Sequence, residues 1–269
     1  MTAPTPALLF SATLSAAAVP HAFTTRRAGV SSGMFDSLNF GNPGDLPVEL
    51  RDPPAHIHAN WQTTLHAIGC GDRQLVEVHQ VHGAAVEVIR ESPAEPGRTP
   101  SPKADAIVTD NPALAIAVRI ADCTPVLLSS RDGRVVAAVH AGWRGVIDGV
   151  AMEAVRTMAA LDALPHTLIA AIGPCIGPAN FEVGPEVALE FHRVFGEYTP
   201  HVRPHPTSQG KFLVDLKAAL AEQLRIMAIP RTGIDILPHC TFAEPDLFFS
   251  HRRDQGRTGR MAAVISPRA

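Results

Sequence analysis

The chain has 269 residues, of which 46% are apolar and 18% charged, and its formal net charge is −3 at neutral pH. This composition is typical of a globular protein with an ample core, and it excludes a disordered or fibrous chain. Aromatic residues make up only 5% of the chain and no basic stripe is present, so nucleic acid is not expected as a partner.

The four cysteines show no paired spacing, which predicts reduced thiols in a cytoplasmic protein. Residues 7–19 resemble the core of a secretory leader, but no Lys or Arg precedes them and Pro20-His21 stands where small residues would be expected. No apolar run is long enough to span a bilayer, so we expect no membrane partner. A monomer is expected because no coiled-coil or apolar interface stripe is visible.

The first half of the chain is dominated by strand and loop patterns. Residues 24–45 are rich in Gly, Ser, Asn and Asp and predict an ordered functional loop with apolar anchors at Phe35, Leu38 and Phe40. After a Pro-Pro break, a short helix is predicted around residues 58–68. Residues 75–89 predict two strands around a break at His82-Gly83, and the Pro-rich residues 91–105 predict a surface excursion.

The segment from 117 to 145 is interpreted as a hairpin that forms the floor of the functional site. Two apolar runs flank an Asp-Gly turn at residues 131–134, which is a strong hairpin signal. The first run carries Asp122 and Cys123 in its middle, and the second ends in H-A-G-W-R-G from His140. Cys123 could be a small core residue, as most unpaired cysteines are. The acid beside it and the two glycines near His140 favour a site instead.

Strand and helix patterns alternate in the second half. Helices are predicted over 146–164, 184–195 and 217–229, and strands over 167–177, 212–216, 233–241, 246–253 and 260–265. No linker interrupts the pattern, so we expect one domain over residues 1–269, with mixed sheets covered by helices.

His82, Cys123 and His140 have the ligand types of a catalytic zinc ion, with a fourth position left for water. His79 and His82 are three residues apart and would face opposite sides of one strand; His82, beside Gly83, is the better candidate. The three residues form no local metal motif, so the argument rests on their chemistry and on their places at strand ends.

Several motifs resemble the YfiH/DUF152 family, whose members have been described as laccase-domain proteins and as purine nucleoside phosphorylases. They are V-H-Q-V-H-G at 78–83, A-D-C at 121–123, H-A-G-W-R-G at 140–145, G-P-C-I-G-P at 173–178 and T-G-R-M at 258–261. The sequence departs from the family pattern at Ala28, Ala179-Asn180, Leu220 and His251. The resemblance covers nearly the whole chain and implies an α+β fold, a single-domain, mixed-sheet αββα sandwich of the YfiH-like type.

The resemblance implies that His82, Cys123 and His140 hold a metal, which their chemistry favours as zinc, with copper possible. It also implies phosphorolysis of adenosine, inosine, guanosine and methylthioadenosine, with adenosine deamination at the same site. Cys123, His140 and Asp122 are then expected to be catalytic. Asp122 could relay protons or could orient a ligand, and strand alternation would direct it away from the cavity if Cys123 points into it. Substrate binding is expected from Arg26, Asn39, Gln80 and Arg144, and Arg26 is the candidate for phosphate. Arg144 could equally pair with an acid.

Three other functions stay open at the level of sequence. A copper phenol oxidase needs several clusters of His and Cys, whereas the chain offers one H-x-H pattern, at residues 56–58. A hydrolase that edits cell-wall precursors would use the same metal chemistry, and the sequence does not distinguish it from nucleoside chemistry. A non-enzymatic binding module is disfavoured by the vacant metal position.

Overall fold

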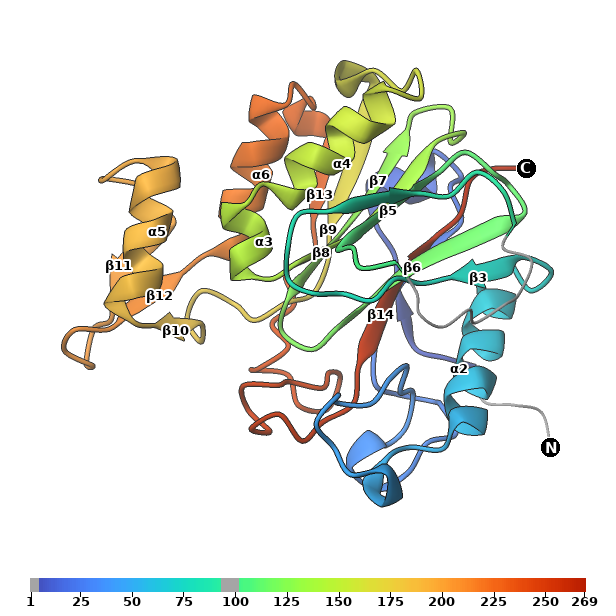
Figure 1. The fold of residues 1–269 in the computed structure, drawn as a ribbon, viewed down its shortest axis with the longest axis horizontal. Coiled ribbons are helices and arrows are strands. Elements are labelled where there is room, and N and C mark those ends of the chain that lie inside the picture. The colour runs from blue at the N-terminus through green and yellow to red at the C-terminus, as the bar shows by residue number, and fades with distance from the viewer. Residues whose placement is uncertain (1–4, 93–101) are drawn as a thin grey trace.

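Two β-sheets lie face to face in the computed structural model, which describes residues 5–92 and 102–269 (Figure 1). The five-stranded sheet has the order β1 (Leu8–Leu9), β2 (His21–Thr24), β14 (Met261–Ile265), β6 (Leu114–Ile120) and β3 (Gln74–Val76). The six-stranded sheet has the order β13 (Ile234–Ile236), β9 (Leu168–Ile172), β7 (Thr124–Ser130), β8 (Val136–Ala141), β5 (Ala106–Thr109) and β4 (Val86–Val88). Both sheets mix parallel and antiparallel pairs.

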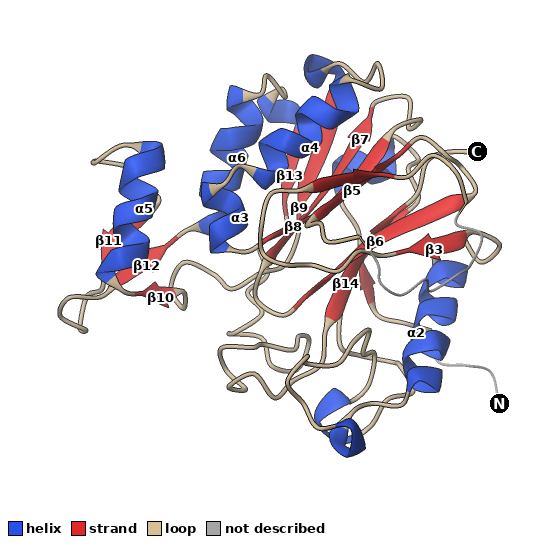
Figure 2. Cartoon of the chain, in the orientation of Figure 1, coloured by secondary structure: helices blue, strands red, loops and turns tan. Residues whose placement is uncertain are grey.

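Helices cover the outer faces of both sheets (Figure 2). Helix α2 (Pro54–Ala67) packs Trp61 and Leu65 on the five-stranded sheet. The outer face of the six-stranded sheet is covered by α3 (Trp143–Ile147), α4 (Val150–Ala159) and α6 (Leu216–Ile226). Between the sheets lies a separate apolar cluster with side chains such as Phe23, Ile116 and Leu127. The order helix, sheet, sheet, helix confirms the predicted α+β sandwich.

Smaller elements complete the described chain. Helix α1 (Ala12–Ala16) follows β1, and a three-stranded sheet of β10 (Glu182–Val183), β12 (Phe212–Val214) and β11 (Val202–Pro204) lies with α5 (Pro185–Phe195) to one side of the sandwich (Figure 1). The 3-10 turns are Gly33–Phe35, Val48–Leu50, Pro165–Thr167 and Arg231–Gly233. Within residues 5–92 and 102–269, none of the helices is long and apolar enough to cross a membrane.

The predicted hairpin is confirmed for β7 and β8, which pair antiparallel around the turn at 131–134. The first apolar run, however, is not one strand. Residues 117–120 end β6 in one sheet, and β7 begins at Thr124 in the other. Asp122 lies between them with a φ of +86°, a left-handed conformation that carries the chain from sheet to sheet. The hairpin that underlies the site therefore consists of β7 and β8 alone.

Three further predictions need correction. The helix expected over 146–164 is split into α3 and α4 by Gly149, whose φ of +76° is incompatible with a helix, and it ends at Ala159. No strand forms over 246–253; Phe248 and Phe249 are apolar because they are fully buried in a turn region. Helix α2 begins at Pro54, earlier than expected, because proline is well suited to the first helical position.

The two strands predicted over 75–89 are present as β3 and β4, but they belong to different sheets. The Pro-rich segment predicted at 91–105 falls largely on residues 93–101, which lie outside the described residues.

Candidate metal centre

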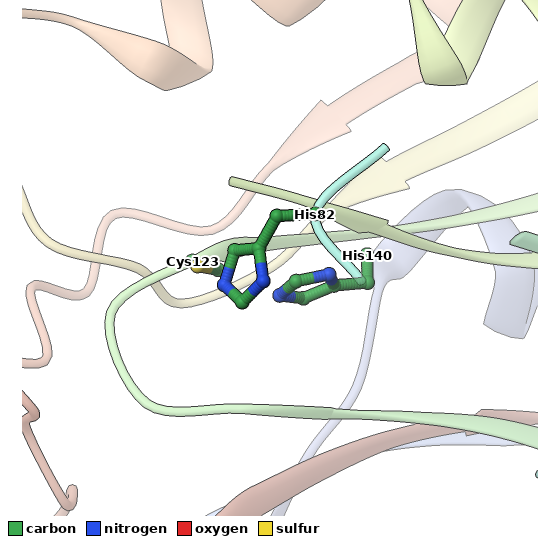
Figure 3. Close-up of side chains that lie close together, drawn as sticks. All are labelled: His82, Cys123 and His140. Atoms are coloured by element: carbon green, nitrogen blue, oxygen red, sulfur yellow. The ribbon is translucent and has the colours of Figure 1, made fainter. Parts of the chain in front are cut away.

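His82, Cys123 and His140 come together from three separate segments, and their ligating atoms all lie within 4.8 Å of one another (Figure 3). His82 lies in the connection between β3 and β4, Cys123 directly precedes β7, and His140 is near the end of β8. The β7–β8 register pairs Pro125 with His140, which brings Cys123 to the same end of the sheet. The rings of His82 and His140 meet edge to face, with centroids 4.9 Å apart.

A fully buried carboxylate, that of Asp105, fixes both histidines. It accepts hydrogen bonds from the backbone N–H groups of His82 at 2.9 Å and Gly83 at 2.7 Å, and from Nδ1 of His140 at 2.8 Å. Because Nδ1 of His140 donates to a carboxylate, its Nε2 is left as the atom that can bind a metal. Asp105 also supports the backbone of His82, whose φ of +63° turns that side chain toward Cys123.

Electrostatics favour a charged state of Asp105. Burial raises the pKa of this carboxyl group, but the hydrogen bond from His140 and those from the backbone at Gly83 and His82 outweigh burial and lower it below the usual range. Sequence reasoning missed this residue. The sequence feature that could have identified Asp105 is an acid at the start of the apolar segment A-D-A-I-V. A carboxylate at the start of a buried strand is costly unless it has hydrogen-bond partners.

Cys123 and His140 form a coupled thiolate–imidazolium pair. Burial raises the pKa of Cys123, but the neighbouring imidazoles, His140 above all, lower it to about 6. Burial lowers the pKa of His140, whereas the Cys123 thiolate and Asp105 raise it to about 9. A metal ion bound here would meet a thiolate already formed and would displace one proton from His140.

The space around the three ligands fits a metal ion. A Cβ atom on Gly142 would lie 3.0 Å from Cδ2 of His82 and 3.2 Å from Sγ of Cys123, so only glycine leaves this space free. Two imidazole nitrogens and a thiolate suit zinc, and also copper. His140 is buried, Cys123 half-buried and His82 exposed, so solvent or substrate can reach a fourth position.

Asp122 points away from the three ligands. Its carboxylate accepts hydrogen bonds from Oγ1 of Thr241 at 2.6 Å, Oγ of Ser250 at 2.9 Å and the backbone N–H of Arg252 at 2.7 Å. These contacts tie the loop over 241–252 to the backbone beside Cys123. They favour an orienting role for Asp122 over a proton relay.

Two of the expected substrate-binding side chains, those of Gln80 and Asn39, already form hydrogen bonds within the protein. The side-chain amide of Gln80 donates to the carbonyl of Arg119 and accepts from its N–H, both at 2.8 Å. Asn39 is fully buried; its Nδ2 donates to Asp52 at 2.8 Å and its Oδ1 accepts from the N–H of Arg260 at 2.8 Å. Both residues thus position neighbours, and their contact with substrate stays a prediction.

The two expected arginines make different contacts. Arg26 donates to the carbonyls of Asp36 at 2.8 Å and Pro245 at 3.2 Å, and its guanidinium lies 4.5 Å from the ring centre of Phe249. Arg144 is exposed on α3 and stacks on Trp143 at 4.4 Å, and no acid among residues 5–92 and 102–269 forms an ion pair with it. Its role in substrate binding also stays a prediction.

Comparison with known proteins agrees with this architecture. A family model described as multi-copper polyphenol oxidoreductase laccase matches residues 20–268. Purine nucleoside phosphorylases of Mycobacterium bovis and Deinococcus radiodurans are 38% and 35% identical to the chain, over 90% and 98% of it and over 89% and 94% of their own lengths.

Solved structures show the same fold. A Neisseria meningitidis protein of family DUF152 superposes with a TM-score of 0.81 at 36% identity, covering 97% of this chain and 99% of its own. A Bacillus licheniformis protein, YfiH, superposes with a TM-score of 0.83 at 27% identity, covering 98% and 97%. The chain belongs to the multi-copper polyphenol oxidoreductase laccase family, also described as YfiH/DUF152.

Proposed function

We propose that this protein is a zinc-dependent purine nucleoside phosphorylase that acts on adenosine, inosine, guanosine and methylthioadenosine. The observation that carries the proposal is the convergence of His82, Cys123 and His140 above Asp105. The chain holding this site is 35–38% identical to proteins named purine nucleoside phosphorylase. In the reaction, an oxygen of phosphate bonds to the sugar carbon while the bond to the base breaks, which yields free base and sugar 1-phosphate.

The residues of the chain prepare the site in defined ways. Asp105 holds the backbone of His82 and the ring of His140, and Cys123 is present as a thiolate at neutral pH. Gly142 keeps the space between them clear. A zinc ion bound by these three side chains would supply Lewis-acid chemistry at the open side of the site.

Adenosine deamination at the same centre belongs to this proposal. There water attacks the purine carbon that bears the amino group, so that a carbon–oxygen bond forms as the carbon–nitrogen bond breaks and ammonia leaves. A zinc ion held by His82, Cys123 and His140 would be accessible from the side of the exposed His82 and would supply Lewis-acid chemistry for both reactions.

The geometry does not favour a multicopper oxidase, despite the description of the family model. In residues 5–92 and 102–269, a single group of three or more side chains can hold a metal. Oxidation by multiple coppers would require further groups of ligands. The same single centre would also serve a hydrolase acting on cell-wall precursors, which the experiment below separates.

Metal analysis and a phosphate-dependent assay on adenosine and inosine test the proposal. We expect about one zinc per chain, and base with sugar 1-phosphate released only when phosphate is present. Cys123→Ala should lose both metal and activity, whereas the control Cys70→Ala, at a buried core thiol, should keep both. Bound metal with neither base release nor deamination would refute nucleoside chemistry and direct attention to cell-wall precursors. Undiminished metal in Cys123→Ala would refute the site.

A further inference from the structure

Two arginines that sequence reasoning did not single out lie side by side at the end of the five-stranded sheet. Arg119 is near the end of β6, and Arg260 directly precedes β14. The antiparallel register pairs Arg119 with Ala262, so the side chains of Arg119 and Ala262 face the same side of the sheet. Arg260, two residues before Ala262, continues on that side and is the diagonal neighbour of Arg119.

Arg260 lies close enough to the metal centre for the charge of Cys123 to act on its guanidinium group, and the charge of Arg119 acts on the same group. Continued by one step, the register places Arg260 opposite Ala121, two residues from Cys123. Arg119 is bound on its backbone by the amide of Gln80, which is two residues before His82. The segment of Arg119 therefore continues to Cys123 and is hydrogen-bonded to the segment of His82, and the segment of Arg260 pairs with the segment of Arg119.

The guanidinium groups have unused hydrogen-bond donors. Nη1 of Arg260 donates to the carbonyls of Thr258 at 2.9 Å and Gly259 at 3.0 Å; within the described parts of the chain, its Nε and Nη2 have no acceptor. Nε of Arg119 lies 3.2 Å from Oε1 of Glu77, which leaves its terminal nitrogens without an acceptor among those same residues. Gly41 makes room for Arg119, because a Cβ there would lie 3.0 Å from Nη1.

The pair carries excess positive charge. Glu77 is the one carboxylate within ion-pair distance of either arginine among the residues described. Burial lowers the pKa of Arg260, and the nearby charge of Arg119 lowers it further, while Cys123, Asp122 and Asp45 act in the opposite direction. Two adjacent cations with free donors are stabilised by a shared anion, and the planar guanidinium fork matches the oxygens of phosphate.

We propose that Arg119 and Arg260 form the binding subsite for inorganic phosphate beside the metal centre. This proposal rests on the proposed phosphorolysis, and it gives to these two residues the task expected of Arg26. Arg26 is less suited because two of its guanidinium nitrogens, Nε and Nη1, already donate to carbonyl oxygens and its guanidinium stacks on Phe249, whereas Arg260 uses Nη1 alone. The phosphate group of a nucleotide has the same chemistry, so the experiment separates the free ion from the ester.

Direct binding of inorganic phosphate to the metal-loaded protein tests the subsite without reference to activity. Titration calorimetry in a phosphate-free buffer would compare the unaltered protein with Arg119→Gln, Arg260→Gln and Arg260→Lys. The control is Arg90→Gln, which removes one cation from an exposed pair with Asp110. We expect each Gln variant to bind phosphate at least tenfold more weakly, since charged hydrogen bonds contribute about that much, and Arg90→Gln to bind it unchanged. Arg260→Lys should lie between, because it keeps the charge and loses the fork.

Steady-state kinetics give a second readout: the KM for phosphate should rise roughly tenfold in both Gln variants, while the KM for inosine changes less than twofold. If Arg260→Gln does not fold, Arg119→Gln alone tests the subsite. The Arg119 side chain is 35% exposed, so its replacement is expected to leave the fold intact. Phosphate affinity within twofold of the unaltered value in a folded variant would overturn the subsite. Binding of adenosine 5′-monophosphate that depends on the two arginines, without any binding of inorganic phosphate, would also overturn the proposed phosphate subsite. Arginine-dependent phosphate binding in a protein with no phosphorolysis would uphold the subsite and refute the proposed function.

Discussion

One buried carboxylate, that of Asp105, holds two of the three side chains of the candidate metal centre in place. It supports the turn that carries His82 through backbone N–H groups and sets the tautomer of His140 through Nδ1. Carboxylates in this position orient histidine ligands and raise their basicity. The ligand arrangement therefore depends on a residue that does not itself face the metal.

Replacing Asp105 with Asn should weaken zinc binding by roughly 10- to 100-fold. The amide keeps the size of the side chain but cannot accept as many hydrogen bonds, and it leaves His140 free to rotate or change tautomer. Competition with a chromophoric chelator would measure the affinity. Asp110→Asn, which alters an acid in the surface pair with Arg90, serves as the control and should bind zinc normally. Equal affinities in the two variants would contradict the positioning role.

The metal-free protein should contain one unusually reactive thiol. Cys123 has a pKa of about 6 because His140 stabilises its thiolate, whereas burial raises the pKa of Cys175 to about 12. Thiolate forms above the pKa, so alkylation of Cys123 by iodoacetamide should follow a midpoint near pH 6, with Cys175 unmodified at neutral pH. His140→Gln should shift this midpoint upward. Peptide mass spectrometry across pH 5–9 would detect both; a midpoint unchanged by His140→Gln would count against the coupled pair.

Helices and strands that are marked by a local sequence signal, such as a turn motif or an initial proline, were predicted correctly from the sequence. The Asp-Gly turn and its flanking strands are found as β7 and β8, and the Pro-initiated helix is found as α5. The break at Asp122 was missed because apolar residues dominate both flanking strands, and an apolar run does not reveal when the chain changes sheet. The strand expected at 246–253 failed for a related reason, since burial in a turn produces the same apolar residues.

The contact between the sheets near the site leaves no room for a side chain at Gly173, the residue after β9. A Cβ there would lie 2.3 Å from Cε1 of Phe23, which is fully buried and cannot move aside. Gly173→Ala should therefore lower the free energy of unfolding by about 1–3 kcal/mol. Urea denaturation would measure it. Gly44→Ala, where a Cβ would meet nothing within 4 Å, should change stability by less than about 0.5 kcal/mol. Similar stabilities of the two variants would show that Phe23 and its neighbours can make room for a methyl group at residue 173.

For the whole molecule, the three ligands join parts of the fold that are distant in the chain. His82 follows the edge strand of the five-stranded sheet, while Cys123 and His140 belong to the hairpin of the six-stranded sheet. Residue chemistry and family resemblance could single out these side chains. Asp105, Arg119 and Arg260 are harder to single out, because their neighbours are set by strand pairing and by the turn at His82 rather than by nearby sequence.

Because the ligands converge only in the folded chain, zinc should stabilise the whole protein. Free zinc at about 1,000 times its Kd would add about 4 kcal/mol to the free energy of unfolding, seen as a rise in Tm that a chelator reverses. At a fixed concentration of free zinc, the increment should grow between pH 6 and 9. The pKa of His140 is about 9, and zinc must displace its proton, so the apparent Kd falls as the pH rises. Cys123→Ala should show little zinc-dependent rise at any of these pH values, while Cys70→Ala should respond as the unaltered protein does. A rise that is independent of pH, or that persists in Cys123→Ala, would mean that zinc stabilises the fold from another site.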